Sequence, residues 1–413
     1  MAVIRPFKAF RPCADLIEKI PALPYDVMSS EEAREMVKGN EYSFLHVDKA
    51  EIDLPVGTDL YSDEVYAKAA ENLNRMIENG NFVQDEKPCL YIYAQVFNGR
   101  RQVGIVGCAS IDDYLNNVIK KHEKTRADKE ADRIRHVDAC DANTGPIFLC
   151  YRNTDKLDLI IESIIADTPE FDFVTDDKVR HSIWKIADEQ IINAIVGEFD
   201  NIPFVYIADG HHRSASAVRV GQMRREANPD YTGEEEFNFF LAVYFRVDEL
   251  MIMDYNRLIA DTNGLTTKEL LEKLSEKFDV TAIDRADRKP KVSHTFGMYI
   301  DNQWYKLVAK EGTFDENDPI GCLDVSILQN NVISPIFDIH DPRTDKRIDF
   351  VGGIRGLDEL EKRCSEDMKL AFAMYPTTME ELMNIADADM IMPPKSTWFE
   401  PKLLSGLFIH KLS

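Results

Sequence analysis

The sequence lacks paired cysteines. Its 413 residues include only seven cysteines, none in a Cys-x-x-Cys spacing and none at a zinc-like distance from the nine histidines. Neither a disulfide framework nor a structural zinc site is therefore indicated. Cys89, Cys108 and Cys150 lie in apolar, strand-like runs and are predicted to be small core residues.

The sequence also lacks an apolar run long enough to span a bilayer, and no apolar segment follows the first residues, Met1 to Lys8. We therefore expect a soluble, cytoplasmic protein without a membrane partner. Hydrophobic residues make up 44% and aromatic residues 10% of the chain, which are ordinary globular values. A chain of 413 residues is long enough for two domains.

Positive charge and glycine-rich phosphate loops are scarce as well. The formal net charge of −24 repels a polyanion, so nucleic acid is not a predicted partner. There is no Gly-x-Gly-x-x-Gly, and Lys395-Ser396-Thr397 lacks the glycines of a Walker A loop. An anionic ligand consequently needs a concentrated positive site of its own.

One such site is predicted in residues 203 to 223. A short apolar strand leads into Asp209-Gly210-His211-His212-Arg213, and a helix follows with Ser214 or Ser216 as its expected N-cap. A turn of this kind aims backbone N–H groups and the positive end of a helix dipole at one point. The pattern predicts a phosphate site with a metal ligand, Asp209, beside it. A purely structural turn is the alternative, but polar residues gathered at this density favour function.

A second stretch, residues 112 to 138, is predicted to be one helix. His122, Arg126, Lys129, Arg133 and His136 would then share one face, which could bind the distal phosphates of a donor. Lys124 and Thr125 in the same stretch are further predicted donor-binding residues. The alternative is a solvated helix held by ion pairs that contribute about 0.3 to 0.5 kcal/mol each. The polar turn Asn143-Thr144-Gly145-Pro146 follows and could reach the same ligand.

A third stretch lies near the C-terminus, between Met392 and Lys402. Two lysines and two hydroxyl groups stand there on a loop stiffened by prolines. Lys395, Ser396, Thr397 and Lys402 are predicted to bind a carboxylate or phosphate. A helix cap flanked by surface lysines is the equal alternative.

The remaining pattern predicts mixed α/β structure throughout. Predicted helices cover 29–39, 62–79, 155–166, 188–199, 323–333 and 357–364, with further helices starting near 266 and 379. Predicted strands cover 42–47, 89–97, 101–111, 146–151, 171–175, 181–187, 237–247, 250–261, 348–351 and 370–375, and residues 295–308 are predicted to form a hairpin. Asn98-Gly99 predicts a primed hairpin turn, and 237–247 is expected to pair with 250–261. A domain boundary is expected near residue 262.

These motifs carry a resemblance. Nearly end to end, the chain resembles the bacterial family called domain of unknown function 1015, which shares Leu-Pro-Tyr25-Asp26-Val, His122-Glu-Lys-Thr-Arg126, Asn143-Thr-Gly-Pro and Asp209-Gly-His-His-Arg213. Over less of its length it resembles the archaeal free-serine kinases of the ParB/sulfiredoxin-like fold, through the last of these motifs and the run from Ile348 through Leu370 to Thr397. The resemblance implies a ParB/sulfiredoxin-like nucleotide- and phosphate-binding domain at 1–261. A smaller α/β domain at 262–413 would complete the substrate site.

The resemblance also implies a reaction, the transfer of a phosphoryl group from a nucleotide to the hydroxyl of free L-serine, which gives O-phosphoserine. Asp209 would hold Mg²⁺ or orient the donor phosphates, which His211, His212 and Arg213 would bind together with Gly210 and Ser214. The general base would be Asp26, where the kinases have a glutamate, although Glu31 or Glu32 could serve instead. Tyr25, Asn143, Thr144 and the Lys395 to Thr397 run would bind the substrate.

Other functions stay open. The same pocket could hydrolyse phosphoserine or phosphorylate another small hydroxyl compound, and a non-catalytic, nucleotide-sensing ParB-like module would use it for binding alone. The donor stays open among ATP, ADP and pyrophosphate. The oligomeric state also stays open, with a homodimer among the options.

Overall fold

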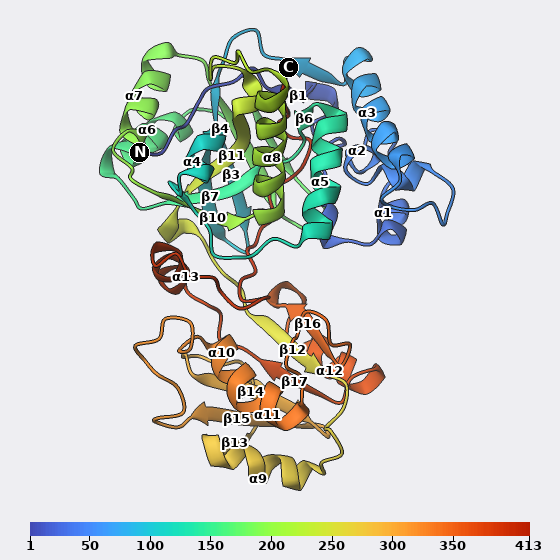
Figure 1. Ribbon diagram of the computed structural model, residues 1–413, viewed down its shortest axis with the longest axis vertical. Helices are drawn as coiled ribbons and strands as arrows, with labels where there is room; N and C mark the ends of the chain where they lie inside the picture. The colour runs from blue at the N-terminus through green and yellow to red at the C-terminus, as the bar shows by residue number, and fades with distance from the viewer. The chain divides into compact units, whose positions relative to one another are not determined.

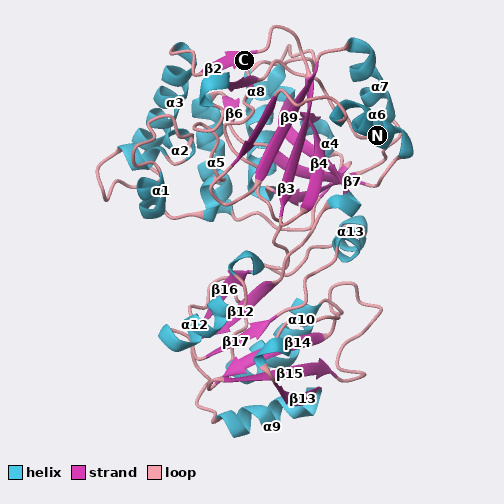
Figure 2. Ribbon diagram, turned by 180° about the vertical axis from the view of Figure 1, so that it is seen from behind, coloured by secondary structure: helices cyan, strands magenta, loops and turns pink.

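The structure is a computed structural model that describes residues 1–413. The chain divides into two compact units, the first formed by Met1–Leu250 with Pro401–Ser413 and the second by Met251–Glu400. Both contain helices and sheets (Figures 1 and 2), so the mixed α/β class is confirmed. The sequence placed the boundary near residue 262, whereas this division falls at Leu250 and returns the last residues to the first unit.

The first unit is built on an eight-stranded mixed sheet in the order β5-β10-β7-β11-β4-β3-β9-β8. Two small sheets, β1-β2 and β18-β6, flank it. Its strands are β1 Phe10–Pro12, β2 Phe82–Gln84, β3 Leu90–Phe97, β4 Arg100–Ser110, β5 Ile119–Lys120, β6 Ala142–Asn143, β7 Ile147–Tyr151, β8 Phe171–Val174, β9 Arg180–Ile186, β10 Val205–Asp209, β11 Phe239–Arg246 and β18 His410–Lys411.

Helix α8 lies across this sheet with α5 beside it, while α1 to α3 gather on the far side of α5 (Figure 1). The helices are α1 Ser30–Met36, α2 Leu45–Asp48, α3 Asp63–Glu78, α4 Ile111–Leu115, α5 Ala127–Cys140, α6 Asp155–Ile165, α7 Glu189–Phe199 and α8 His211–Ala227. Strands β4, β7 and β11 are buried along nearly their whole length, so the main core lies between the sheet and its helices. A second core joins α1 to α3 to the β2 strand.

The second unit is an antiparallel six-stranded sheet in the order β13-β15-β14-β17-β12-β16. Its strands are β12 Tyr255–Ile259, β13 Phe278–Ile283, β14 Thr295–Ile300, β15 Gln303–Ala309, β16 Ile348–Gly352 and β17 Leu370–Ala373. Its helices are α9 Thr267–Lys277, α10 Asp324–Leu328, α11 Ser334–Phe337, α12 Asp358–Glu366 and α13 Met379–Asp387, with a π-helical turn at Gln329–Ile333 between α10 and α11.

Several local predictions are confirmed. Asn98 and Gly99 adopt φ angles of 49° and 77°, as the primed turn between β3 and β4 requires. Ser29 and Glu32 form the expected capping box at the start of α1. The amphipathic pattern of 62–79 becomes α3, whose apolar side is buried.

Other local predictions are wrong. Residues 42–47 are not a strand, because Leu45–Asp48 form the short helix α2 that packs its apolar side chains into the second core. Residues 112–138 are not one helix: α4 ends at Leu115, Asn117 takes a left-handed φ of 59°, and β5 follows before α5 begins at Ala127. Segments 237–247 and 250–261 do not pair, since β11 and β12 belong to different sheets.

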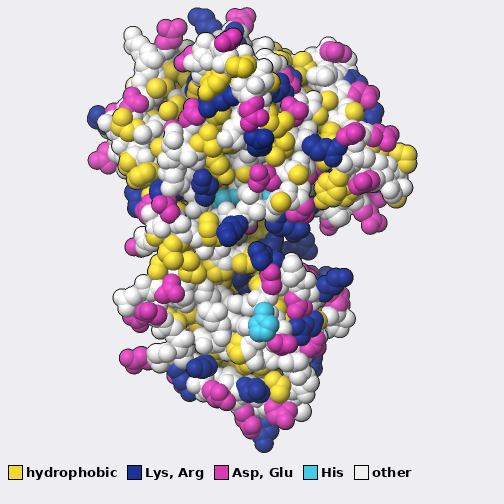
Figure 3. Space-filling model, viewed as in Figure 1, with side chains coloured by type: hydrophobic (Ala, Val, Ile, Leu, Met, Phe, Trp, Pro, Cys, Tyr) yellow, Lys and Arg dark blue, Asp and Glu magenta, His cyan; other side chains and the backbone are white.

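None of the helices is both long and apolar enough to cross a lipid bilayer. Acidic and basic side chains are interspersed over the visible face of each unit (Figure 3). The net charge of −24 is therefore not segregated into one acidic surface on this face.

Candidate anion-binding site at the start of α8

The site is centred on the turn from β10 into α8. Gly210 occupies the N-cap position with a φ of 95°, a left-handed conformation that glycine adopts without steric penalty, and no side chain caps the helix. The first intrahelical bond runs from the Ser214 N–H to the Gly210 carbonyl at 2.9 Å. The N–H groups of His211, His212 and Arg213 thus precede the helical ladder, where they can meet an anion together with the helix dipole.

The helix start corrects the sequence prediction of its N-cap. Ser214 and Ser216 lie inside α8, and their hydroxyl groups donate to the carbonyls of His211 and His212 at 3.0 and 2.6 Å. Both serine side chains are fully buried. Because the left-handed Gly210 already turns the chain into the helix, the two histidines and Arg213 form its first turn, and Ser214 points away from any ligand at the helix end.

Strand pairing brings three segments to this turn. Strand β10 runs parallel to β5, so the carboxyl ends of both strands meet at one edge of the sheet and the loop 121–126 lies beside Asp209. Strand β7 runs antiparallel to β10 and pairs Phe148 with Asp209, which brings the turn 143–146 to the same edge. The sheet order places β10 between β5 and β7, and Figure 1 shows β7 and β10 as neighbours beside α8.

Asp209 is held in an ion pair. Its Oδ1 accepts a hydrogen bond from the Gly210 N–H at 2.8 Å, and its Oδ2 accepts one from the Lys402 ammonium at 3.0 Å. Burial alone would raise the pKa of Asp209, but the positive charges of Lys402 and Arg213 outweigh burial and hold that pKa well below its usual range. The carboxylate is therefore ionised and neutralised by its neighbours.

Arg213 lies directly over the turn. Its Nη1 donates to the Pro146 carbonyl at 2.8 Å. A Cβ on Gly210 would lie 3.4 Å from Arg213 Nε and one on Gly145 3.6 Å from Arg213 Nη1, so the guanidinium lies within van der Waals range of both turns. Arg213 thereby adds a fixed positive charge to the free N–H groups of α8.

His211 joins the turn to the 121–126 loop. Its ring is buried, and Nε2 accepts the His122 backbone N–H at 3.4 Å. Burial and the neighbouring His122 ring lower the pKa of His211 well below 6.5, so the imidazole is neutral. A neutral ring that accepts at Nε2 carries its proton on Nδ1, which lies 3.8 Å from Glu123 Oε2. His211 therefore anchors the loop and contributes no charge.

His122 packs edge-on against His211, with ring centroids 4.4 Å apart. It is 2% exposed, and neither ring nitrogen has a hydrogen-bond partner of good geometry. Burial lowers its pKa to about 4, against the opposing effects of Asp209 and the Ile207 carbonyl. A buried imidazole with no good partner is uncommon, so His122 is the least satisfied polar group next to the turn.

His212 makes the corresponding contact on the more exposed side. Its Nε2 accepts the Arg126 backbone N–H at 3.0 Å. Burial lowers its pKa, and the nearby carboxylate of Asp26 opposes this shift. Asp26 itself is exposed and lies in the 3₁₀ turn Tyr25–Val27. An exposed carboxylate therefore lies near the first turn of α8.

Tyr25 and Arg133 pack against each other next to Asp26. The Arg133 guanidinium stacks over the Tyr25 ring at 4.0 Å and its Nε donates to Asp132 at 2.9 Å. Burial opposes the charged form of Arg133, but Tyr25, Asp132 and Asp48 raise its pKa. Burial and Asp26 in turn raise the pKa of Tyr25, while Arg133 and Arg213 act against this.

The other predicted donor-binding residues point elsewhere. Thr125 donates to Glu130 at 2.7 Å, Lys129 contacts the Tyr61 hydroxyl at 2.9 Å, and the Arg126 guanidinium pairs with Asp128 at 2.9 Å. His136 and Arg133 are buried in α5, whereas His122, Lys124 and Arg126 precede that helix. The predicted single positive face therefore does not exist, because the chain turns at Asn117 and pairs as β5 before α5 starts.

Asn143 and Thr144 have internal partners. Asn143 Oδ1 accepts the Leu241 N–H at 3.2 Å, and Thr144 donates to Asp48 at 2.8 Å. Both residues are buried. Their side chains hold the turn before β7, and the substrate contacts expected of them stay predictions.

Lys395, Ser396 and Thr397 belong to the second unit. Lys395 is exposed, and its ammonium lies 5.6 Å from the Tyr255 ring centroid. Ser396 is 7% exposed and donates to the Pro393 carbonyl at 2.6 Å, so its hydroxyl closes the local turn. Their predicted role in substrate binding is not tested by these contacts.

A dedicated Mg²⁺ site is not built here. No group of three or more His, Cys, Asp or Glu side chains could hold a metal ion. Asp209 offers one carboxylate, and its oxygens already meet Lys402 and the Gly210 N–H. Mg²⁺ takes most of its ligands from water and substrate phosphates, so an ion would have to arrive with a nucleotide.

Sequence reasoning missed the pairing of Lys402 with Asp209. Lys402 lies 193 positions from Asp209 along the chain and reaches it only through the return of the C-terminal residues to the first unit. Its carbonyl accepts from Gln95 at 2.8 Å, and Gln102 donates to Gln95 at 2.8 Å. No local pattern in the sequence signals this contact, because only tertiary structure creates it.

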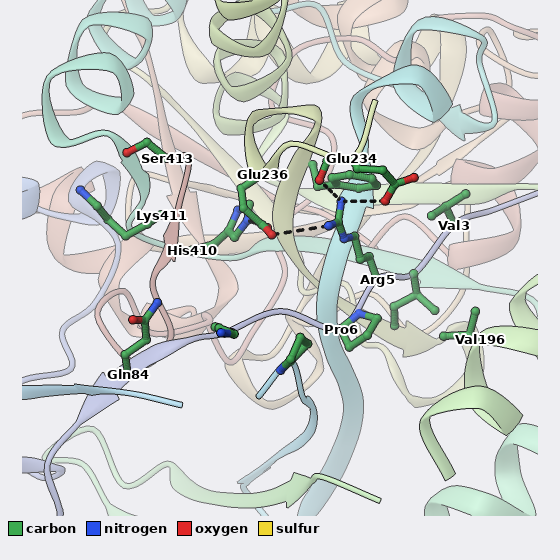
Figure 4. Close-up of a pocket in the computed structure, with 14 residues that line it drawn as sticks. Val3, Arg5, Pro6, Gln84, Val196, Glu234, Glu236, His410, Lys411 and Ser413 are labelled. Atoms are coloured by element: carbon green, nitrogen blue, oxygen red, sulfur yellow. Dashed lines mark hydrogen bonds and ion pairs between the residues drawn. The ribbon is translucent and has the colours of Figure 1, made fainter. Parts of the chain in front are cut away.

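The first unit also contains a separate cavity of about 540 Å³ that none of the predicted site residues lines. Arg5 crosses it and forms ion pairs with Glu234 at 3.8 Å and with Glu236 at 3.5 Å (Figure 4). Glu236 is also 2.8 Å from the His410 ring. The charges that line this cavity are thus largely paired with one another.

Comparison with known proteins identifies the family. The family profile described as "Protein of unknown function (DUF1015)" matches residues 4–326, so the chain belongs to this family, as the motifs predicted. No curated protein matches the chain.

Among solved structures, the chain is similar to a mutant free serine kinase in complex with ADP (12% identity, TM-score 0.36, covering 72% of this chain and 87% of that one). It is also similar to a truncated SbnI from Staphylococcus aureus (10% identity, TM-score 0.38, 73% and 85%). A conserved hypothetical protein from Pyrococcus furiosus is a third (14% identity, TM-score 0.32, 72% and 90%). These likenesses are too weak to support an argument about function.

Proposed function

We propose that the protein is a phosphotransferase that moves a phosphoryl group from a nucleotide to the hydroxyl of free L-serine, giving O-phosphoserine. The observation that carries the proposal is the uncapped start of α8, where free N–H groups, Arg213 and the paired Lys402 meet at the end of β10. Phosphoryl transfer depends chiefly on neutralising and positioning phosphate charge, which is what this arrangement offers.

The proposed donor phosphates bind at the N–H groups of His211, His212 and Arg213. The Arg213 guanidinium neutralises developing charge on the transferred group, and Lys402 keeps Asp209 from repelling it. Mg²⁺ bound to the nucleotide would supply further neutralisation. His211 and His212, both with lowered pKa values, hold the 121–126 loop beside the phosphates in their neutral form.

Asp26 is the proposed general base. The serine hydroxyl oxygen forms a bond to the terminal phosphorus of the donor, the bond from that phosphorus to the bridging oxygen breaks, and the hydroxyl proton passes to the Asp26 carboxylate. The nucleotide leaves with one phosphate fewer. Asp26 suits this role because it is exposed and lies close enough to His212 to oppose the shift in its pKa.

The test is ³¹P NMR of the full chain with MgCl₂, L-serine and, in turn, ATP, ADP or pyrophosphate. We expect a phosphoserine resonance to grow while one donor declines. Arg213→Met should lower the rate by about 10²- to 10³-fold. The matched control is Arg224→Met, at the far end of the same helix, where the arginine pairs with Asp138 at 2.8 Å. The absence of phosphoserine with every donor would overturn the proposal.

A further inference from the structure

One arginine of the second unit is buried without an acidic partner. Three arginines of the chain are almost fully buried, namely Arg11 at 8% exposed, Arg133 at 9% and Arg257 at 4%. Arg11 pairs with Asp85 at 2.9 Å and Arg133 with Asp132 at 2.9 Å. Arg257, the most deeply buried of the three, stands apart from this rule for buried charges.

Only neutral groups surround Arg257. On strand β12, its Nη1 donates to the Tyr255 carbonyl and its Nη2 to the Lys395 carbonyl, the latter at 2.9 Å. The Phe350 ring lies 5.5 Å from its guanidinium carbon. Burial lowers the pKa of Arg257 to about 10, and the Tyr255 phenol is the only other group that acts on it. No carboxylate compensates the buried charge.

The turn that covers Arg257 carries a second positive charge. Lys395 adopts a φ of 60°, the left-handed region that side chains other than glycine seldom occupy. Ser396 and Thr377 fasten this turn through the Pro393 and Ser396 carbonyls, at 2.6 and 3.0 Å. The Lys395 ammonium stays exposed on the same side as Tyr255.

Trp398 holds the end of the same turn against the sheet. Its ring packs edge-on against Tyr255 at 5.1 Å and would clash with any Cβ on Gly352, which pairs with Tyr255 across β12 and β16. The cover over Arg257 is therefore anchored on both sides, while Lys395 between the anchors keeps a less stable backbone conformation.

We propose that Arg257 and Lys395 form a binding site for a small oxyanion, a carboxylate or a phosphate group, in the second unit. The anion would replace the Lys395 carbonyl at Nη2, because a hydrogen bond to a charged oxygen is roughly twice as strong as one to a neutral oxygen. Arginine suits this task, since its planar fork matches both groups. The site lies wholly within the second unit and does not depend on the proposed phosphotransferase activity.

The test is isothermal titration of the full chain with inorganic phosphate and, separately, with acetate, at constant ionic strength. We expect one of the two anions to bind the unaltered protein and to raise its Tm. Arg257→Met should abolish acetate binding, or remove from the phosphate titration the one event that does not belong to the proposed α8 site. Arg363→Met is the matched control, because this arginine of the same unit pairs with Asp349 and Asp367 and should leave the titration unchanged.

Two further variants keep the result clear. If Arg257→Met fails to fold, Arg257→Lys retains the charge without the fork, and we expect binding at least tenfold weaker. Arg213→Met weakens the proposed phosphate site at α8, and a phosphate binding event that Arg257→Met abolishes in this background belongs to the second unit. Preference for phosphate or for acetate identifies the group. The proposal fails if neither anion binds, or if both Arg257 variants bind as the unaltered protein does.

Discussion

The two units present positive charge to a ligand in different ways. At the start of α8, Lys402 and Arg213 are balanced by the carboxylate of Asp209, and free backbone N–H groups supply much of the field. In the second unit, Arg257 is nearly fully buried and meets only carbonyl oxygens and an aromatic ring.

This difference separates a site that is complete without its ligand from one that is not. The ion pair of Asp209 and Lys402 keeps the first site stable when empty, and the helix dipole is available without any side-chain rearrangement. Arg257 bears the cost of burial with no compensating charge, so its region gains most from an incoming anion. We accordingly expect reaction chemistry at the first site and binding alone at the second.

The largest expected effect tests that division. Asp26→Asn removes the proposed base and should lower kcat by about 10²- to 10⁴-fold while the donor KM changes little. Phosphoserine formation under saturating serine and donor measures the loss. Glu31→Gln and Glu32→Gln are the controls, and glutamine preserves the capping box at Glu32. A loss that follows either glutamate would transfer the base away from Asp26.

Acid should affect the first site through His122. Its pKa falls from 6.5 to about 4 on folding, so between these values the unfolded chain binds the proton more strongly. The neutral, buried His122 ring therefore costs no stability above pH 6.5, and the free energy of unfolding declines as the pH falls from 6.5 toward 4. At about 1.4 kcal/mol for each pKa unit, His122 accounts for a loss of about 3 kcal/mol in the free energy of unfolding between pH 6.5 and pH 4.

His122→Phe keeps an aromatic ring at this position but removes the titrating group. It should lower the number of protons taken up on unfolding between pH 4 and 6.5 by up to one, which makes the free energy of unfolding less dependent on pH. Hydrogen exchange of peptides from β4, β7 and β11 between pH 4.5 and 7 measures it within the first unit. His340→Phe is the control, because this ring is exposed in the second unit. An unchanged slope in His122→Phe would show that the buried ring does not govern the acid response.

A smaller effect contrasts Lys402 of the first unit with Arg257 of the second. Lys402→Met leaves Asp209 without its main partner and should lower the free energy of unfolding by about 1 to 3 kcal/mol. Lys369→Met, which breaks an exposed pair with Asp301, should cost less than about 1 kcal/mol. Urea denaturation at pH 7 measures both. Arg257→Met leaves no carboxylate without a partner, so it should lower the free energy of unfolding less than Lys402→Met does. A larger loss in Arg257→Met would contradict the proposed difference between the two units.

Much of the local structure could be predicted from the sequence, because its signals are short-range. Asn98-Gly99 encodes its hairpin, and the Ser29 and Thr266 caps encode two helix starts. The motif from Asp209 to Arg213 was correctly placed between a strand and a helix. Only the position of the N-cap was wrong, because serine is the commoner capping residue and the left-handed glycine gave the weaker signal.

What the sequence could not give depends on pairing between distant segments. His122 reaches His211 because β5 runs parallel to β10, and a strand of two residues is too short to detect by periodicity. The isolation of Arg257 from any acid depends on packing around β12, β16 and the 393–398 turn. The pattern of charges along the sequence predicts neither the contact between His122 and His211 nor the isolation of Arg257.

The smallest predicted effect concerns backbone alone. Gly210→Ala forces a Cβ into a φ of 95° and should cost about 1 to 2 kcal/mol of stability. Gly197→Ala, in helix α7 with nothing within 4 Å of the added Cβ, should instead stabilise by about 0.5 to 1 kcal/mol. Thermal denaturation of the pair, with a phosphate titration of each, measures both consequences.

The phosphate result decides between two views of the first site. Gly210→Ala changes no charge, so a selective loss of phosphate binding would mean that the geometry of the α8 N–H groups holds the anion. Unchanged binding would mean that Arg213 and Lys402 hold it as side chains, as we propose for Arg257 and Lys395. In that case the contrast between the two units would reduce to the presence or absence of one carboxylate, that of Asp209.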